Sequence, residues 1–413
     1  MNKRTAVLLV ILLVAVLAVA AAGCSSSSTT TTTEPSTATT GAATTGTTTA
    51  APTGEPIVFG AVVSATGPNA PLGQPERQVL IMMEKSINAA GGIDGRPVKI
   101  VIEDDKSTPA EAVTATQKLI NQDKAIAIIG GTGSASTLAM KPITSKAGIP
   151  QIAMAAANAI TDLPPVDWIW RTPPKDAIAA EKAVNYVAND LKAKNIAVLY
   201  DSNAFGSSGF KEIQKLAPKY GLTIVDSESY KTEDTDLTAQ LTKINGKNPD
   251  AVIVWGTNPG PAIAAKNMKQ LGMAMPYVGS HGIANQTFIK LAGPAAEGVV
   301  FPAGKLAVPS SITDSKQKEV VDKFIADYQA ATGGQNPNTF AGHAFDSVSL
   351  LENAIKVAKG TDPAALQKAL NETTGFVGPD GIYNYSNTNH DGLAASDMIV
   401  VKIENGKWVL AAN

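Results

Sequence analysis

The sequence of 413 residues contains one cysteine and three histidines, and this scarcity excludes several kinds of site. The single thiol, Cys24, can form neither an intramolecular disulfide nor a cysteine-built metal site. The histidines, His281, His343 and His390, are scattered along the chain without the spacing of metal ligands. We therefore expect no bound metal and no cofactor.

An excess of charge of one sign is also missing, because 34 basic residues accompany 36 acidic ones. No block of lysine and arginine follows the first few residues, so the basic surface that nucleic-acid binding requires is not expected. Hydrophobic residues make up 44% of the chain, which is enough to form one or two cores. We expect a globular protein with no nucleic-acid partner.

Familiar catalytic motifs are absent as well. The sequence has no HExxH, no GxSxG, and no cysteine beyond the first 24 residues. Ser280 and His281 are neighbours in "GSHG", but a catalytic pair would need a third, orienting group, and the sequence indicates none. We therefore expect a protein that is not an enzyme.

A glycine-rich turn is present in "AIAIIGGTGSAST", residues 125–137, where an apolar run ends and a helical pattern begins near Ser134. A P-loop would place a lysine at this helix start, and the next lysine is Lys141. A dinucleotide fingerprint would need a third glycine and an acidic residue earlier than Asp162. The free amides of a helix start favour a carboxylate or similar anion. The alternative is that these residues only cap their own helix.

The first 24 residues end in "AAGC" and combine a basic start, a long apolar run and small residues before Cys24. This layout is typical of an export signal, and "AAGC" resembles the lipobox of bacterial lipoproteins. The alternative is a retained transmembrane helix. We expect residues 1–23 to be a signal peptide, Cys24 to carry a lipid anchor, and the Ser/Thr-rich residues 24–55 to form a disordered tether.

From Ile57 onward, short apolar runs alternate with amphipathic segments, which is typical of parallel sheets covered by helices on both faces. The clearest helix start is at 107–122, where Thr108, Pro109 and Glu111 form a start signal. Strands are expected at 57–63, 98–104, 125–131, 149–154, 195–201, 222–228, 250–256 and 275–280. Later helices are expected at 314–333, 344–360 and 362–373, followed by a strand pair that turns at Asn405-Gly406.

Breaks at 168–176 and around Pro302 interrupt this alternation, so we expect two α/β lobes between which the chain crosses more than once. Ligands of such sheets bind beyond the carboxyl ends of the strands. A ligand cleft between the two lobes is therefore expected.

Six stretches carry a family resemblance: "IVFGAVVSATGPNAPLGQ", "INAAGGIDGRPVKIVIEDDKSTPAEAV", "IIGGTGSAST", "IPQIAMAAAN", "AVLYDSNAFGSSG" and "YVGSHGIAN". Together they resemble the leucine/isoleucine/valine-binding family of solute-binding proteins, which deliver ligands to ABC importers. The resemblance implies two Rossmann-like lobes that close by hinge motion around a ligand. It implies crossovers near 172–175, 301–303 and 389–392, lobe 1 at 56–173 and 302–389, and lobe 2 at 174–301 and 390–413.

The resemblance also implies ligand contacts. The ligand carboxylate would meet Ser134 and the backbone at Ala155, whereas Ala157 falls at a family threonine and lacks its hydroxyl. The family's acidic partner for a ligand ammonium falls on His281. The other contacts fall on Leu72, Phe205, Asn258 and Phe340, with Trp255 also expected to enclose the ligand.

A neutral imidazole at His281 cannot replace a carboxylate opposite a buried ammonium, because an unpaired buried charge costs several kcal/mol. The pattern therefore favours an aromatic or other acid without an α-amino group, its apolar body enclosed by aromatic side chains. The alternative is a branched-chain amino acid, with His281 turned away and an acid such as Asp201 facing the ammonium.

These inferences predict an extracytoplasmic, lipid-anchored monomer that hands a small carboxylate ligand to the permease subunits of an ABC importer. The alternative is a sensor ectodomain that signals through a separate partner receptor.

Overall fold

The computed structural model describes residues 51–412, all of which fall in one compact unit. The expected signal peptide, Cys24 and most of the expected tether lie outside these residues. Within residues 51–412, no helix combines the length and the apolar character needed to cross a membrane.

The first sheet has five parallel strands in the order β2-β1-β3-β4-β5. The strands are β1 (Ile57–Val63), β2 (Val98–Asp104), β3 (Ala127–Gly130), β4 (Gln151–Ala153) and β5 (Ile169–Arg171). Helices cover both faces, which is why β1 is apolar throughout. Phe59 faces α1 (Ala70–Ala89) and α11 (Thr339–Ala358), while Val62 faces α2 (Pro109–Asn121) and α3 (Ser134–Ala147).

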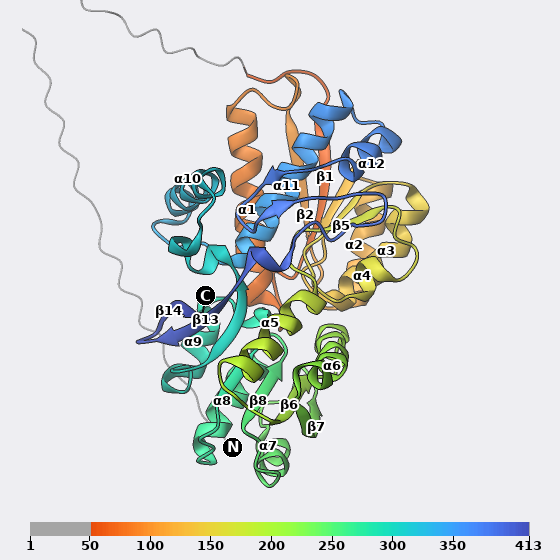
Figure 1. Ribbon diagram of the computed structural model, residues 1–413. Coiled ribbons are helices and arrows are strands. Elements are labelled where there is room, and N and C mark those ends of the chain that lie inside the picture. Colours follow the sequence, from red (N-terminus) through yellow and green to blue (C-terminus); the bar gives the residue numbers. More distant parts are fainter. Residues whose placement is uncertain (1–50, 413) are drawn as a thin grey trace, which may run out of the picture. The chain divides into compact units, whose positions relative to one another are not determined.

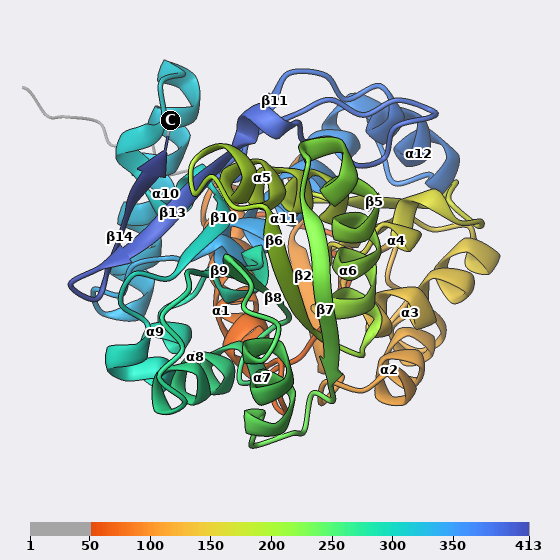
Figure 2. The ribbon, with the colours of Figure 1, turned by 60° about the horizontal axis from the view of Figure 1, so that its bottom comes forward.

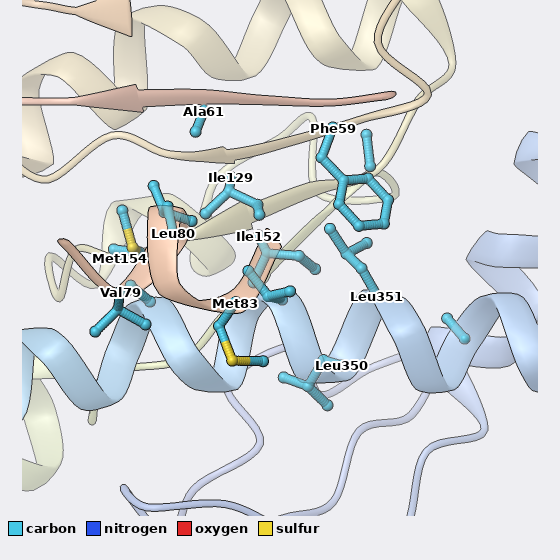
Figure 3. Packing of buried hydrophobic residues seen from close by; sticks show 14 of the residues in the cluster. Phe59, Ala61, Val79, Leu80, Met83, Ile129, Ile152, Met154, Leu350 and Leu351 are labelled. Atoms are coloured by element: carbon cyan, nitrogen blue, oxygen red, sulfur yellow. The ribbon is translucent and has the colours of Figure 1, made fainter. Parts of the chain in front are cut away.

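Figure 3 shows side chains of α1 and α11 packed against Phe59, Ile129 and Ile152 of this sheet. Because α11 comes from the last quarter of the chain, the first sheet depends on segments far apart in the sequence. The α1 and α11 helices lie side by side (Figure 1). Three shorter segments complete this region: α4 (Ala159–Asp162), α10 (Ser315–Thr332) and α12 (Pro363–Asn371).

The second sheet has seven strands in the order β14-β13-β10-β9-β8-β6-β7. Five are parallel: β6 (Asn195–Asp201), β7 (Thr223–Tyr230), β8 (Ala251–Trp255), β9 (Tyr277–Gly279) and β10 (Val300–Gly304). The antiparallel pair β13 (Met398–Glu404) and β14 (Lys407–Ala412) extends this sheet beyond β10. A separate two-stranded ladder joins β11 (Phe376–Val377) and β12 (Ile382–Tyr383).

Helices also cover both faces of the second sheet (Figure 2). One face packs against α5 (Asp176–Asn189) and α6 (Ala204–Leu216). The other packs against α7 (Thr238–Asn245), α8 (Gly260–Gln270) and α9 (Gln286–Ala292). The predicted α/β class, with mostly parallel sheets flanked by helices, is confirmed.

The two segments that were predicted to interrupt the alternation of strands and helices, 168–176 and the region around Pro302, each contain a strand. Ile169–Arg171 forms β5, and Val300–Gly304 forms β10, so the expected crossover at 301–303 lies inside the second sheet. Pro302 lies opposite Val400 of β13, while the parallel pairing of β10 with β9 involves only Val300, so the β9 side of Pro302 carries no ladder pair. The chain passes from the first sheet to the second after β5 and leaves the second sheet after β10. The exact lobe boundaries stay a prediction.

Candidate functional site

A cavity of about 240 Å³ is lined by segments that follow strands of both sheets. Residues 132–136 follow β3, 154–156 follow β4, and the second sheet contributes Phe205 after β6, Thr257 after β8 and His281 after β9. All these segments lie at carboxyl ends of strands, where open α/β sheets bind their ligands. The expected position of the ligand cleft thus coincides with this cavity.

The start of α3 gives one wall its polarity. Its N-cap, Gly133, has no side chain that could cap the helix, and the amides of Ser134, Ala135 and Ser136 have no hydrogen-bond partner within residues 51–412. The Ser134 hydroxyl accepts a hydrogen bond from the Ala157 amide at 3.3 Å, so its own hydrogen is free to donate. This wall can hold an anion through amides, a hydroxyl and the positive end of the helix dipole.

Glycine is required at the turn before α3. Gly130 has φ of 119°, and a Cβ there would lie 2.1 Å from the Val62 carbonyl oxygen. A side chain at Gly133 would lie 2.9 Å from Asn69 Nδ2, at the cavity wall. The glycines therefore let the backbone of the turn approach both the sheet and the cavity.

A buried arginine that was not predicted supports this wall from behind. Arg171 ends β5 and donates hydrogen bonds to the carbonyl oxygens of Ala156 at 2.7 Å and Ala157 at 3.1 Å. Its Nε lies 2.8 Å from Asp391, which also lies 3.1 Å from Lys175 Nζ. Although burial opposes it, the Arg171 guanidinium holds the pKa of Asp391 below its usual value. The positive charge is thus bound to protein groups rather than presented to the cavity.

His281 stands on the opposite wall, in a single 3₁₀ turn capped by Ser280, whose Oγ accepts from the Gly282 amide at 3.2 Å. Its ring lies edge-on to Phe205, with centroids 5.2 Å apart, and to Trp255, at 5.8 Å. Burial lowers the pKa of His281 to about 3, and the nearby His343 and Arg171 act in the same direction. The imidazole is therefore neutral at physiological pH.

A buried carboxyl group lies behind His281. Asp176 Oδ1 is 3.8 Å from His281 Nε2, which is too far for a hydrogen bond, and Asp176 does not line the cavity. Burial raises the pKa of Asp176 to about 7. Sequence reasoning missed this group because an aspartate that begins a helix is ordinary there.

The structure brings six of the predicted site residues to the cavity lining: Leu72, Ser134, Ala155, Phe205, His281 and Phe340. Ala157, Asn258 and Trp255 are not on the lining. Ala157 instead binds the Ser134 hydroxyl, Asn258 Nδ2 donates to Asn285 at 3.2 Å, and Trp255 packs behind Phe205. Direct contact of the lining residues with a ligand stays a prediction.

Asp201, the alternative partner for a ligand ammonium, does not line the cavity either. Its carboxylate accepts hydrogen bonds from the Asn203 amide at 3.0 Å and the Thr232 hydroxyl at 2.8 Å. The lining does include one carboxylate that was not predicted, Glu233, whose side chain is exposed. His343 is a second residue of the cavity lining that was not predicted. No cluster of three metal-binding side chains occurs among residues 51–412.

Comparisons with known proteins agree with this architecture. Residues 56–407 match the family model described as periplasmic binding protein. A Pseudomonas aeruginosa "amino acid binding protein" is 29% identical over 310 residues, which cover 75% of this chain and 80% of that protein. The "leucine-, isoleucine-, valine-, threonine-, and alanine-binding protein" of the same species is 28% identical over 76% of this chain and 82% of its own.

Solved structures give the same result. An extracellular ligand-binding receptor from Rhodopseudomonas palustris HaA2 has a TM-score of 0.81 and 30% identity, covering 86% of this chain and 100% of its own. The branched-chain amino acid transporter substrate binding protein LivJ from Streptococcus pneumoniae, solved with isoleucine, has a TM-score of 0.77 and 28% identity, covering 86% and 98%. These relatives are solute-binding proteins and not enzymes, as expected for this chain. The chain belongs to the periplasmic binding protein family and is a relative of its leucine/isoleucine/valine-binding proteins.

Proposed function

We propose that this protein captures a small carboxylic acid without an α-amino group and, by hinge closure, delivers it to the permease subunits of an ABC importer. As a member of its family the protein acts outside the cytoplasm, and a lipid on Cys24 would hold it at the membrane as a monomer. The observation that carries the proposal is the contrast between the uncapped start of α3 and the neutral His281 opposite it.

The carboxylate end of the ligand is supported by the first-sheet wall. Three free amides and the Ser134 hydroxyl converge there, and hydrogen bonds to a charged group are about twice as strong as neutral ones. Leu72, Phe205 and Phe340 supply apolar lining for the rest of the ligand.

The surroundings of the position expected for a ligand ammonium group support a ligand that has no α-amino group. His281 is neutral, and the carbonyl oxygens of Ala156 and Ala157 already accept from Arg171. Asp176 lies behind His281 and off the cavity lining. An ammonium there would lose its hydration without gaining a buried carboxylate.

A branched-chain amino acid is the second candidate, favoured by the names of the relatives and by Glu233 on the cavity lining. An exposed carboxylate can face an ammonium, but water screens such a pair, which is then worth about 0–1 kcal/mol. The Glu233 side chain therefore separates the two candidates experimentally.

The test is a thermal-shift and calorimetric screen of protein that has been unfolded and refolded to remove any carried-over ligand. Benzoates and short aliphatic acids would be compared with leucine, isoleucine and valine. A ligand at one hundred times its Kd adds about 2.7 kcal/mol of stability. We expect acids without the amino group to give this response. A response to leucine alone would contradict the proposal.

Two variants sharpen the screen. His281→Glu should weaken acid binding and admit leucine, because it restores a carboxylate at the family position. Glu233→Gln is the matched control and should leave acid binding unchanged. A leucine response of the unmodified protein that Glu233→Gln abolishes would establish the second candidate instead.

A further inference from the structure

His343 is a second histidine on the cavity lining, and the family resemblance assigned it no role. It lies on α11, three residues after Phe340, and only 4% of its surface is exposed. Its Nδ1 is 2.5 Å from Asp380 Oδ2, whereas its Nε2 has no hydrogen-bond partner within residues 51–412. The imidazole is thus fixed through one nitrogen, and the other is available to a molecule in the cavity.

Asp380 belongs to a buried group of polar side chains. The Asp346 Oδ2 atom accepts from the Asp380 amide at 3.0 Å, and Tyr383 Oη lies 2.8 Å from the same oxygen. Burial raises the pKa of Asp380 and of Asp346 well above the usual range. No lysine or arginine is bonded to either carboxyl group in the part of the chain described, so their surroundings favour the neutral acids over the carboxylates.

A protonated Asp380 fixes the tautomer of His343. Burial lowers the pKa of His343 to about 3, so the ring is neutral and the carboxyl group holds the shared proton. The Asp380 O–H then donates to Nδ1, which must accept, and the single ring hydrogen resides on Nε2. If the shared proton moved to Nδ1, Nε2 would still carry a hydrogen. Both arrangements keep a hydrogen on Nε2 and present a donor to the cavity, whereas loss of the shared proton from the pair would leave Nε2 as an acceptor.

We propose that His343 Nε2–H is a ligand subsite distinct from the carboxylate site, and that the natural ligand is an acid whose apolar body carries an oxygen acceptor such as a hydroxyl, keto or ether group. This inference rests on the proposed function and adds the class of substituent. Asp380 is a positioning residue, because it acts on the ligand only through the imidazole.

The surroundings of His343 favour an oxygen rather than a cation or an alkyl group. The Phe340 ring lies edge-on to the imidazole at 5.4 Å, and His281 is the neutral ring on the opposite wall. A buried donor left without an acceptor has lost its hydrogen bond to water without gaining another. A purely apolar acid would leave the Nε2–H unsatisfied in this cavity.

The experiment compares the three hydroxybenzoate isomers with the three methylbenzoate isomers by calorimetry on the full chain. The hydroxyl and methyl groups are close in size, so the comparison isolates the hydrogen bond. We expect one hydroxybenzoate to bind roughly tenfold more tightly than its methyl counterpart, which is the range of one net hydrogen bond. In His343→Phe this preference should disappear while the methyl isomer keeps its affinity.

Asp380→Asn is the conservative variant. Its amide N–H can still donate to Nδ1, so Nε2–H and the preference for the hydroxyl isomer should be retained. Because His343→Phe leaves Asp380 without its partner, ¹⁵N imidazole spectra of the unmodified protein provide a second readout that needs no substitution. These spectra should show a neutral ring with hydrogen on Nε2. The Nε2 resonance should shift only with acids whose apolar body carries an oxygen acceptor.

The outcomes separate the two proposals. Equal affinity for both series in the unmodified protein, or a preference that survives His343→Phe, would overturn the subsite and leave acid binding intact. A ring with hydrogen on Nδ1 alone would also overturn it. Binding of leucine, with no response to any acid that lacks an α-amino group, would overturn both the subsite and the proposed function.

Discussion

The two walls of the cavity handle charge in different ways. The first-sheet wall offers free amides at Ser134 and places a cation, Arg171, behind them, where Asp391 compensates its charge. The second-sheet wall carries aromatic rings, and among residues 51–412 no lysine or arginine side chain pairs with Asp176, the buried carboxyl group behind it. One wall can therefore bind an anion through dipoles, while the buried part of the other is apolar and its one carboxylate on the lining, Glu233, is exposed. This difference orients a ligand that is charged at one end only.

The largest expected effect comes from removing Arg171, the buried cation behind the first-sheet wall. Arg171→Met should reduce the free energy of unfolding by about 3–5 kcal/mol, because removal of one partner leaves the other buried charge uncompensated. Asp391 would lose its 2.8 Å contact, and the carbonyl oxygens of Ala156 and Ala157 would lose their donors. Chemical denaturation measures the change.

Lys175→Met is the matched control, because Lys175 pairs with the same Asp391 from a more exposed position. Its effect should stay within about 1 kcal/mol. Equal losses in both variants would show that the buried Arg171 compensates Asp391 no better than the more exposed Lys175 does.

Asp176, the buried carboxyl group behind the second-sheet wall, should make the stability of the protein depend on pH. The pKa of Asp176 is about 7 when folded, against 3.8 for the free side chain, so between these values only the folded state holds the proton. Stability contributed by this group is therefore present below about pH 4 and is lost as pH rises toward 7. Asp176→Asn should flatten the decline by about 1 kcal/mol per pH unit.

Denaturation curves between pH 4 and 8 test this effect, and only the difference from the unmodified protein counts, since other buried acids also titrate. Asp250→Asn serves as a comparison, because hydrogen bonds from the Asn195 and Lys194 amides lower the pKa of that carboxyl group, so its removal should not flatten the decline. Parallel curves for Asp176→Asn and the unmodified protein would contradict the assignment of a raised pKa.

Ser134→Ala tests the anion-binding wall directly. We expect binding of a carboxylate ligand to weaken by about 1–3 kcal/mol, because a charge-assisted hydrogen bond is lost. Ser145→Ala, on the same helix but away from the cavity, is the control and should bind normally. Unchanged affinity in Ser134→Ala would remove this hydroxyl from the site.

The smallest effect concerns the hydrogen bond that joins the two walls. The Thr257 hydroxyl donates to Asn69 Oδ1 at 3.2 Å, and both residues line the cavity. Asn69→Ala should weaken ligand binding by about 0.5–1.5 kcal/mol if this bond stabilises the closed form. Asn69→Ala and Thr257→Val together should cost no more than one of them alone. Additive losses would show that the residues act separately.

Much of the fold could be predicted from the sequence, because apolar runs such as 57–63 and helix starts such as Thr108 are local signals. The strand β5 was missed because it is short and is followed by two prolines, and β10 was missed because it contains Pro302; such segments locally resemble loops. Their place in the sheets is set by pairing with β4 and β13, which no local pattern reveals.

The candidate site was only partly predictable. Ser134 and His281 could be placed because the turns that carry them follow recognisable strands. Arg171, Asp176 and His343 could not, since their properties come from burial and from neighbours distant in the sequence, such as Asp391 and Asp380. An ordinary aspartate or histidine acquires an altered pKa only when the fold removes it from water.

By itself the sequence determined the α/β class, the glycine turn before α3 and the family, because these depend on local patterns and on similarity along most of the chain. The tertiary structure decided which side chains share the cavity and which of them are neutral. Hydrogen bonding and burial fix those states, and both arise only when segments from the two sheets come together around Ser134, His281 and His343.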